Sequence, residues 1–256
     1  MSHPYWIAFT SLVRKEVTRF SRIWVQTLVP PAITMTLYFL IFGNLIGSRI
    51  GQMGGFSYME FIMPGLIMMS VITNSYANVA SSFFSAKFQR NIEELLVAPV
   101  PNILIILGYV AGGVARGLCV GAIVTLVGLF FVDIQIHNLP VLLLTLLMTS
   151  TAFALGGLIN AVFAKTFDDI SIIPTFVLTP LTYLGGVFYS ISLLPELWQG
   201  ISQLNPVVYT INAFRYGFLG YSDVSLALSL SVLTALIVAL GAVAYTLIDR
   251  GIGLRH

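Results

Sequence analysis

Six long apolar segments recur along the chain, and each is bounded by charged, polar or glycine-rich sequence. A helix needs roughly 20 apolar residues to cross the hydrocarbon core of a bilayer, and these segments are close to that length or above it. The pattern therefore predicts an all-α, polytopic integral membrane protein with six transmembrane helices. The predicted spans are Ile23–Gly43, Phe61–Phe84, Ile103–Phe131, Val141–Phe163, Ile170–Phe188 and Leu226–Ile248.

A shorter amphipathic segment, residues 1–22, precedes the first span. Within Tyr5–Phe20, apolar residues recur at helical spacing on one face, and basic and hydroxylated residues occupy the other. An aromatic face opposite a basic face is typical of a helix that lies in the membrane interface. We therefore predict an N-terminal interfacial helix; a solvated helical tail is the alternative. The apolar positions are Trp6, Phe9, Val13, Val17 and Phe20, and the polar positions are Ser11, Arg14, Lys15, Thr18 and Arg22.

The segment between the last two spans, residues 190–222, is interrupted by prolines. Pro195 and the Asn205-Pro206 pair divide it into two pieces, and each piece is too short to cross a bilayer as a helix. Backbone at membrane depth that does not span must be buried in protein or face water. The pattern predicts two short re-entrant helices that enter the membrane partway from the outer side. An ordinary amphipathic external loop is equally consistent with it.

The densest cluster of charge lies in residues 85–100, directly after the second span. On a helix, its apolar residues share one stripe and its charged residues another, and Pro99 and Pro101 then stop the helix. Charges of both signs favour docking onto another protein over contact with lipid, where a mainly basic helix is expected; a solvated loop helix is the alternative. The apolar stripe contains Phe84, Phe88, Ile92, Leu95 and Leu96, and the polar stripe contains Lys87, Arg90, Asn91 and Glu94, with Arg90 and Glu94 spaced as an i,i+4 pair.

Composition supports the membrane assignment. The 256 residues are 57% hydrophobic and 9% charged, with a mean hydropathy of +0.94, whereas a soluble domain carries about a quarter charged residues. The single cysteine, Cys119, allows no disulfide within the chain, and the three histidines are scattered, so we expect no metal site.

The distribution of Lys and Arg orients the predicted helices. Six spans place both termini on one side, and short cytoplasmic loops carry an excess of these cations. Nine cations fall on the side of the termini, whereas only Arg49 and Arg215 fall in the opposite loops. We therefore predict cytoplasmic termini, with residues 85–100 and the loop Ala164–Asp169 on the same side.

Two features inside the spans are candidates for a substrate pathway. Arg116 is a cation within the third span, where a charge is costly and usually faces a bundle interior or water. It could bind an anionic headgroup, or it could snorkel or pair with a carboxylate such as Asp168. The fifth span combines prolines with hydroxylated residues, which suits either a pathway wall or a kinked packing helix. These hydroxylated candidates are Thr175, Thr179, Thr182 and Tyr183.

The chain resembles a known family at three places. The stretch after the second span is similar to the charged coupling-helix region of the ABC-2 type transporter permeases, and it reads KFQRNIEELLVAPVP. The basic amphipathic N-terminal segment also resembles that family, as does the Asn-Pro and Arg-containing stretch before the last span, LNPVVYTINAFRYGFLG. The resemblance covers essentially the whole chain, and residues 1–256 are identified as a single ABC-2 type transmembrane domain.

This resemblance implies the membrane subunit of a bacterial ATP-binding cassette (ABC) exporter in the inner membrane. Members of the family work with a separate cytoplasmic ATPase subunit, usually as two permeases and two ATPases. A second permease copy in a homodimer and the surrounding membrane lipids are therefore expected partners. ATP and Mg would bind to the ATPase, and no cofactor is expected on this chain. The cargo would be a lipid, a glycan or a drug-like molecule.

By the same resemblance, the charged cytoplasmic helix would insert into a groove on the ATPase, and the loop Ala164–Asp169 would supply a second contact. A carboxylate favours a helix N-terminus, so Asp168 or Asp169 could instead cap the fifth span. The implied docking residues are Lys87, Phe88, Arg90, Asn91, Ile92, Glu93, Glu94, Leu95, Lys165 and Asp168.

The sequence contains no nucleotide-binding motif of its own. A P-loop requires G-x-x-x-x-G-K-[ST], and the one Lys-Thr pair, Lys165-Thr166, lacks the glycines. A membrane-embedded lipid-modifying enzyme would need a carboxylate, histidine or cysteine constellation near one interface, and a secondary transporter would need carboxylates within its spans. The predicted spans contain neither. We therefore expect a transport subunit without catalytic residues, and no nucleic-acid partner.

Overall fold

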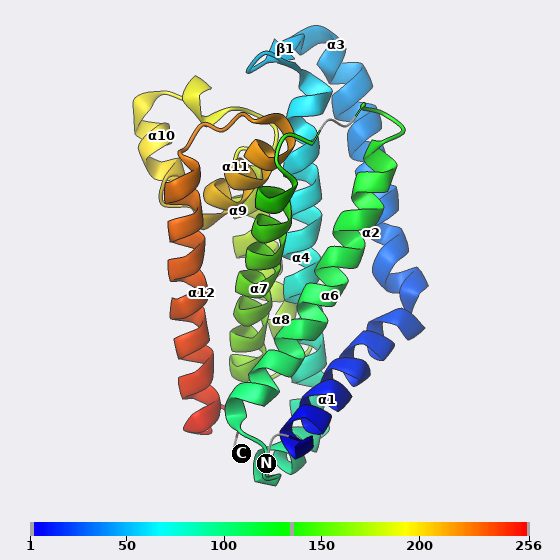
Figure 1. Ribbon diagram of the computed structural model, residues 1–256, viewed down its shortest axis with the longest axis vertical. Coiled ribbons are helices and arrows are strands. Elements are labelled where there is room, and N and C mark those ends of the chain that lie inside the picture. Colours follow the sequence, from blue (N-terminus) through cyan, green and yellow to red (C-terminus); the bar gives the residue numbers. More distant parts are fainter. Residues whose placement is uncertain (1–2, 134–135, 255–256) are drawn as a thin grey trace.

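The computed structural model describes residues 3–133 and 136–254 of the chain. Long helices form an elongated bundle and run along its longest axis (Figure 1). These helices are α2 (Trp24–Tyr38), α4 (Tyr58–Phe88), α6 (Asn102–Gly128), α7 (Leu139–Phe163) and α12 (Leu226–Asp249). The chain is therefore an all-α bundle, as the hydropathy pattern predicted.

Four helical segments of the described chain are long and apolar enough to cross a membrane. They coincide with the predicted first, third, fourth and sixth spans, and they are Trp24–Gly43, Asn102–Gly128, Leu139–Phe163 and Leu226–Asp249. The predicted second span lies within α4, which has 31 residues and includes polar side chains such as Asn74 and Asn78. Most residues of α4 are buried, and it packs against α6 and α7 at the centre of the bundle.

The helix of the predicted fifth span is shorter and less regular than predicted. It consists of α8 (Asp169–Ile173), the π-helical segment η2 (Pro174–Leu178) and α9 (Thr179–Tyr183). Because proline has no N–H donor, Pro174 cannot bond the carbonyl of Ile170. The side-chain amide of Asn160, from α7, donates to that carbonyl instead, at 3.2 Å. The helical run ends before a turn at which Gly186 has a φ of +81°, a conformation that favours glycine.

The first predicted span continues beyond its predicted end at Gly43. After α2 the chain forms the π-helical segment η1 (Phe39–Ile46) and then α3 (Gly47–Ile50). A two-stranded antiparallel hairpin, β1 (Gln52–Met53) and β2 (Phe56–Ser57), leads into α4. We call the end of the bundle with this hairpin the upper end and the opposite end the lower end, as they stand in Figure 1.

Residues 190–222 contain two short helices, which are separated at the Asn205-Pro206 pair. A short 3-10 turn, η3 (Ile191–Leu193), precedes α10 (Glu196–Ser202) and α11 (Pro206–Leu219). Asn205 caps α11 by accepting a hydrogen bond from the backbone N–H of Val207 at 3.0 Å. The next residue is proline, whose missing donor costs nothing at the first helical position. Most of α11 is buried, and it packs against α4, α7 and α12.

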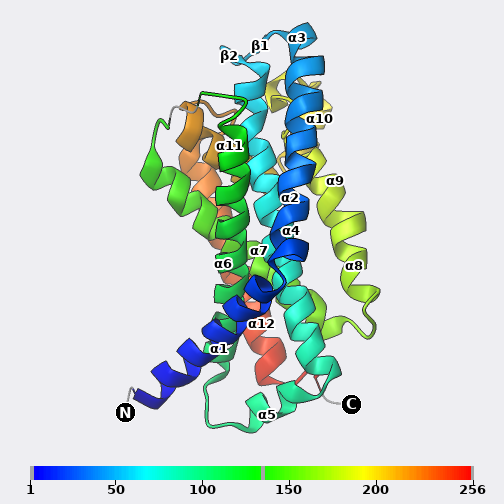
Figure 2. The ribbon, with the colours of Figure 1, turned by 90° about the vertical axis from the view of Figure 1, so that its right-hand side faces the viewer.

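The helix predicted over Tyr5–Phe20 is present as α1 (His3–Arg22), which crosses the lower flank of the bundle at an angle (Figure 2). Its packing face matches the predicted apolar face only in part: Phe20 is buried, but the other buried residues are Leu12 and Glu16. Gly112 of α6 lies under this face, and a Cβ there would be 2.5 Å from the Cβ of Glu16. Glycine at this position therefore allows α1 to approach α6 closely.

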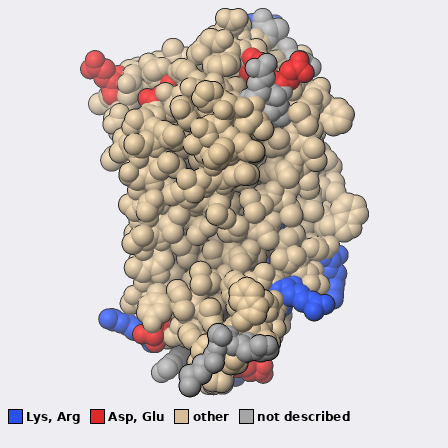
Figure 3. All heavy atoms as spheres, in the orientation of Figure 1, with Lys and Arg blue, Asp and Glu red and all other residues tan. Residues whose placement is uncertain are grey.

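Charged side chains gather toward the two ends of the face seen in Figure 3, and the band between them is uncharged. Lys and Arg predominate in the lower part of this face, whereas Asp and Glu predominate near the upper end. A broad uncharged band between two charged zones is the surface expected of a protein that sits in a bilayer.

Candidate functional site

Residues 85–100 lie at the lower end, and they contain the end of α4 and a separate short helix, α5, rather than one continuous helix. Helix α4 ends at Phe88, and α5 runs from Asn91 to Val97. The turn is made by Arg90, whose φ of 62° is left-handed. This conformation costs a non-glycine residue about 1–2 kcal/mol. Among the described residues no ion pair joins Arg90 and Glu94, because the turn moves Arg90 off the helical register.

One side of α5 holds it to the bundle. Ile92 is buried in the hydrophobic cluster between α4, α6 and α7, and Leu95 and Leu96 are partly buried against the same cluster. The opposite side is exposed and carries Arg90, Asn91, Glu93 and Glu94. The predicted division into an apolar and a charged side is therefore present, over a shorter helix.

Lys87 has a different environment from its predicted neighbours. Its ammonium group is buried and donates to the carbonyls of Val162 at 2.5 Å and Ala164 at 2.9 Å. These carbonyls belong to the C-terminal end of α7, where a cation is favourable. Burial, and the nearby charge of Lys165, lower the pKa of Lys87. Lys87 thus connects the ends of α4 and α7 rather than facing outward.

The structure brings the two predicted docking loops together. The ring of Phe167, in the loop after α7, lies 4.9 Å from that of Phe84 and 5.3 Å from that of Phe88. Both Phe88, 62% exposed, and Phe167, 51% exposed, are open to the surroundings, and Lys165 and Asp168 beside them are exposed as well. We call residues 88–95 and 165–168 together the two-loop surface.

Asp169, not Asp168, orders the second of these loops. Its carboxylate accepts hydrogen bonds from the backbone N–H groups of Lys165 at 2.8 Å and Thr166 at 2.9 Å, while the Thr166 hydroxyl accepts from the Asp169 N–H. This reciprocal pattern is that of a capping box. The two backbone donors hold the pKa of Asp169 below its usual value. Asp168 makes no capping hydrogen bond and stays exposed.

Arg116 lies within a partly buried polar cluster between α1, α4 and α6, and its hydrogen-bond partner is not Asp168. Its guanidinium donates to the side-chain oxygen of Asn74 at 2.9 Å. Asn78 lies one turn further along α4. It accepts hydrogen bonds from Arg19 of α1, through its backbone oxygen at 2.9 Å and its side-chain oxygen at 2.8 Å. The structure therefore gives Arg116 an uncharged partner inside the bundle.

Glu16 completes this cluster, and the sequence pattern had assigned it no role. Its side chain is 0% exposed, accepts a hydrogen bond from Ser82 of α4 at 2.7 Å and pairs with Arg19 at 3.4 Å. The amphipathic pattern predicts an apolar packing face for α1, whereas the structure places the buried carboxylate of Glu16 in the middle of that face. We call Glu16, Arg19, Asn74, Asn78, Ser82 and Arg116 the inner polar cluster.

The hydroxylated residues of the predicted fifth span lie on another face. Thr175, Thr179 and Tyr183 are exposed, and Thr182 is buried. The Tyr183 hydroxyl is hydrogen-bonded to that of Tyr38 in α2, at 2.5 Å. Figure 2 shows α8 and α9 on the opposite side of α4 from α6, which carries Arg116. The structure therefore does not bring Arg116 and the fifth-span residues into one site.

A second buried charge cluster lies near the upper end. Arg215 is fully buried in α11, donates to the carbonyl of Gly186 at 2.6 Å and lies 3.9 Å from the centre of the Phe61 ring. Its guanidinium is 3.8 Å from the carboxylate of Asp223. That carboxylate also accepts hydrogen bonds from Ser190, Tyr221 and the backbone N–H of Ile191.

The placement of Arg215 corrects the prediction that counted it in an external loop. Its helix begins at the predicted Asn-Pro break, but its partners come from α4 and from loops on either side, so nothing local in the sequence indicates burial. Without Arg215, Arg49 is the one cation counted in the loops opposite the termini, so the excess of Lys and Arg remains on the side of the termini.

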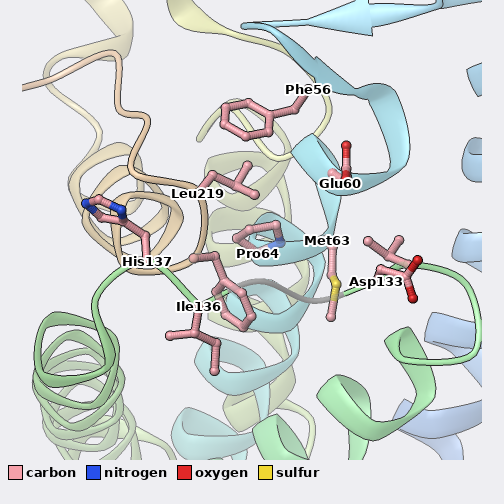
Figure 4. Close-up of a pocket in the computed structure, with 10 residues that line it drawn as sticks. Phe56, Glu60, Met63, Pro64, Asp133, Ile136, His137 and Leu219 are labelled. Atoms are coloured by element: carbon pink, nitrogen blue, oxygen red, sulfur yellow. The ribbon is translucent and has the colours of Figure 1, made fainter.

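A pocket of about 270 Å³ also opens near the upper end, between α4, the segment after α6 and the end of α11 (Figure 4). Glu60, Asp133 and His137 are among its lining residues, together with apolar side chains such as Met63 and Leu219. Glu60 already accepts the Ser57 N–H in the capping box that starts α4. No group of three metal-ligating side chains forms a metal site within the described residues.

The uncharged band and the apolar helices define the class of the molecule as a helical integral membrane protein. A family model for the ABC-2 type transporter matches residues 7–219. The chain is 69% identical over 255 residues to the Inner membrane transport permease YadH of Escherichia coli (strain K12), and the alignment covers 100% of both chains.

More distant relatives carry another name. Nodulation protein J of Rhizobium leguminosarum bv. viciae is 26% identical over 219 residues, which cover 84% of this chain and 83% of that protein. Nodulation protein J of Rhizobium meliloti (strain 1021) is 24% identical over 233 residues, covering 89% and 86%. The chain belongs to the ABC-2 type transporter family, as the resemblance predicted, and it is a permease of the inner membrane.

Proposed function

We propose that this permease is the membrane subunit of an ABC exporter, and that a cytoplasmic ATP-binding cassette ATPase binds it at the two-loop surface. The observation that carries the proposal is that surface itself, in which the exposed rings of Phe88 and Phe167 lie beside charges of both signs. Exposed aromatic side chains grouped with complementary charges are typical of a protein interface. We assign the exposed residues of the two-loop surface to the contact with the ATPase and exclude Lys87, because it is buried.

Force applied to the two-loop surface would reach the centre of the bundle. The surface directly continues α4, and the hydrogen bonds of Lys87 connect the end of α4 to the end of α7. A displacement of α5 and the loop after α7 would therefore move both helices together. The ATPase would bind ATP and Mg and supply the energy, and this chain would supply the path.

We further propose six spans with the lower end in the cytoplasm. Besides the four apolar helices, α4 would span as well, because its 31 residues extend about 46 Å, more than the ~30 Å hydrocarbon core. The segment α8–η2–α9, the fifth along the chain, would be the remaining span. The exposed cations of α1 support this orientation, in which α1 lies along the inner interface and α10 and α11 enter partway from the outer side.

A second permease copy would complete the transport path in a homodimer. The face with α2 and α8–η2–α9 is largely exposed and apolar, and Thr175, Thr179 and Tyr183 add hydroxyl groups to it. We assign contact with the second copy, and contact with a lipid, glycan or drug-like cargo, to this face. Arg116 is assigned a structural role because its guanidinium donates to Asn74 inside the bundle.

Charge reversal on α5 tests the proposed docking. We expect Arg90→Glu and Glu94→Arg to weaken binding of the co-purifying cassette ATPase about tenfold or more, because each change places like charges together in the contact. Binding to the detergent-purified permease and permease-stimulated ATP hydrolysis are the measurements. Arg49→Glu is the matched control, since Arg49 is exposed near the upper end. Wild-type binding and stimulation in both α5 variants would contradict the proposal.

A further inference from the structure

A pocket of about 480 Å³ lies at the lower end between α5 and the end of α12. One wall is apolar and includes Leu96, Val97 and Leu254. Val97 is 85% exposed although it is the last residue of an amphipathic helix, so a large apolar side chain stands open at the rim. The pocket directly adjoins the two-loop surface, because α5 contributes to both.

The charged residues that line this pocket are both acidic. Glu93 extends from α5, and Asp249 is the last residue of α12. The side-chain amide of Asn102 donates to one oxygen of Asp249 at 3.1 Å, which orients the carboxylate at the pocket wall. The described residues provide neither Glu93 nor Asp249 with an ion-pair partner.

An apolar wall beside two carboxylates, of which Asp249 is oriented by Asn102, fits one kind of side chain well. The stem of an arginine or lysine would lie along the apolar wall, and its cationic group would reach the carboxylates. Among the described residues, no Lys or Arg of this chain forms an ion pair with either carboxylate, and Arg19 of α1 is bound to Asn78 instead.

We propose that the ATPase inserts an arginine or lysine side chain into this α5–α12 pocket, between Glu93 and Asp249. This inference rests on the proposed function and deepens it, because each of the two proteins would insert side chains into the other. The two-loop surface of the permease would contact the ATPase, and a cationic side chain of the ATPase would enter the α5–α12 pocket of the permease. The end of α12 would then move with α5, so the last helix of the bundle would receive force directly.

The test uses the cassette ATPase that co-purifies with the full-length wild-type permease. Its dissociation constant is measured at low and high NaCl for wild type, Glu93→Gln, Asp249→Asn and the double variant. We expect each single change to weaken binding about tenfold at low salt. We also expect the double variant to lose most of the salt dependence of binding. Asp133→Asn removes the same charge from an exposed site near the upper end and serves as control.

The outcomes separate this inference from the proposed function. If no cassette ATPase binds the wild type, both are overturned. If the ATPase binds and the Glu93 and Asp249 variants keep wild-type affinity and salt dependence, the pocket inference alone is overturned. A double variant that changes the oligomeric state of the permease but not its affinity for the ATPase would assign the pocket to a second copy and overturn the inference as well.

Discussion

Replacing Arg215 with methionine is expected to destabilise the permease by about 3–5 kcal/mol, because it leaves the buried Asp223 carboxylate without its cation. The change also removes the hydrogen bond to Gly186 and the contact with the Phe61 ring. Most soluble domains are stable by only 5–15 kcal/mol, so a loss of this size is severe. Thermal unfolding and the monodisperse fraction after detergent extraction are the measurements.

The double variant Arg215→Met/Asp223→Asn separates the ion pair from the packing of α11. Without either charge, the buried site is neutral, and we expect the double variant to recover part of the stability lost by Arg215→Met. Arg49→Met is the control, because Arg49 is exposed near the same end of the bundle. If Arg215→Met melts at the same temperature as Arg49→Met, the structural role of the pair is wrong.

Replacing Glu16 with alanine is expected to weaken the attachment of α1 to the bundle by about 1.5–3 kcal/mol, the usual value of a hydrogen bond to a charged group. Ser82 would lose its acceptor and Arg19 its ion-pair partner. Trypsin cleavage at the exposed Arg14 and Lys15 reports the detachment, because a helix must open locally before a protease cuts it.

Two further variants make this second result specific. Glu16→Gln keeps an oxygen that accepts from Ser82, so its cleavage rate should lie between those of wild type and Glu16→Ala. Thr18→Ala changes an exposed position of the same helix and should leave the rate at the wild-type value. Equal cleavage of Glu16→Ala and Thr18→Ala would show that the buried carboxylate does not hold α1 in place.

Local signals explain what the sequence predicted correctly. The breaks at Pro195 and Asn205-Pro206 follow from the missing proline donor and from the capping side chain of asparagine, which act within a few residues. The long apolar segments likewise predict their helices by length alone. The break at Arg90 carries no such signal, because neither glycine nor proline marks the left-handed turn.

Burial of charged side chains depends on partners that are distant in sequence. Lys87 binds carbonyls near residue 163, Glu16 binds Ser82, and Arg215 binds Gly186 and Asp223. Periodicity within one segment sorts polar from apolar positions, but it does not show which polar residue finds a partner inside the bundle. Periodicity therefore places Lys87 and Arg215 at the surface and assigns Glu16 no role.

Photo-crosslinking tests directly whether the ATPase contacts the two-loop surface, on which the proposed function depends most. Benzoylphenylalanine would replace Phe167, which is exposed at the lower end. In a second variant it would replace Phe130, which is 87% exposed and follows the C-terminal end of α6, away from the lower end. We expect the Phe167 variant to form a covalent product with the co-purifying ATPase on illumination and the Phe130 variant to form none. No product from position 167, or equal yields from the two positions, would contradict the proposed contact.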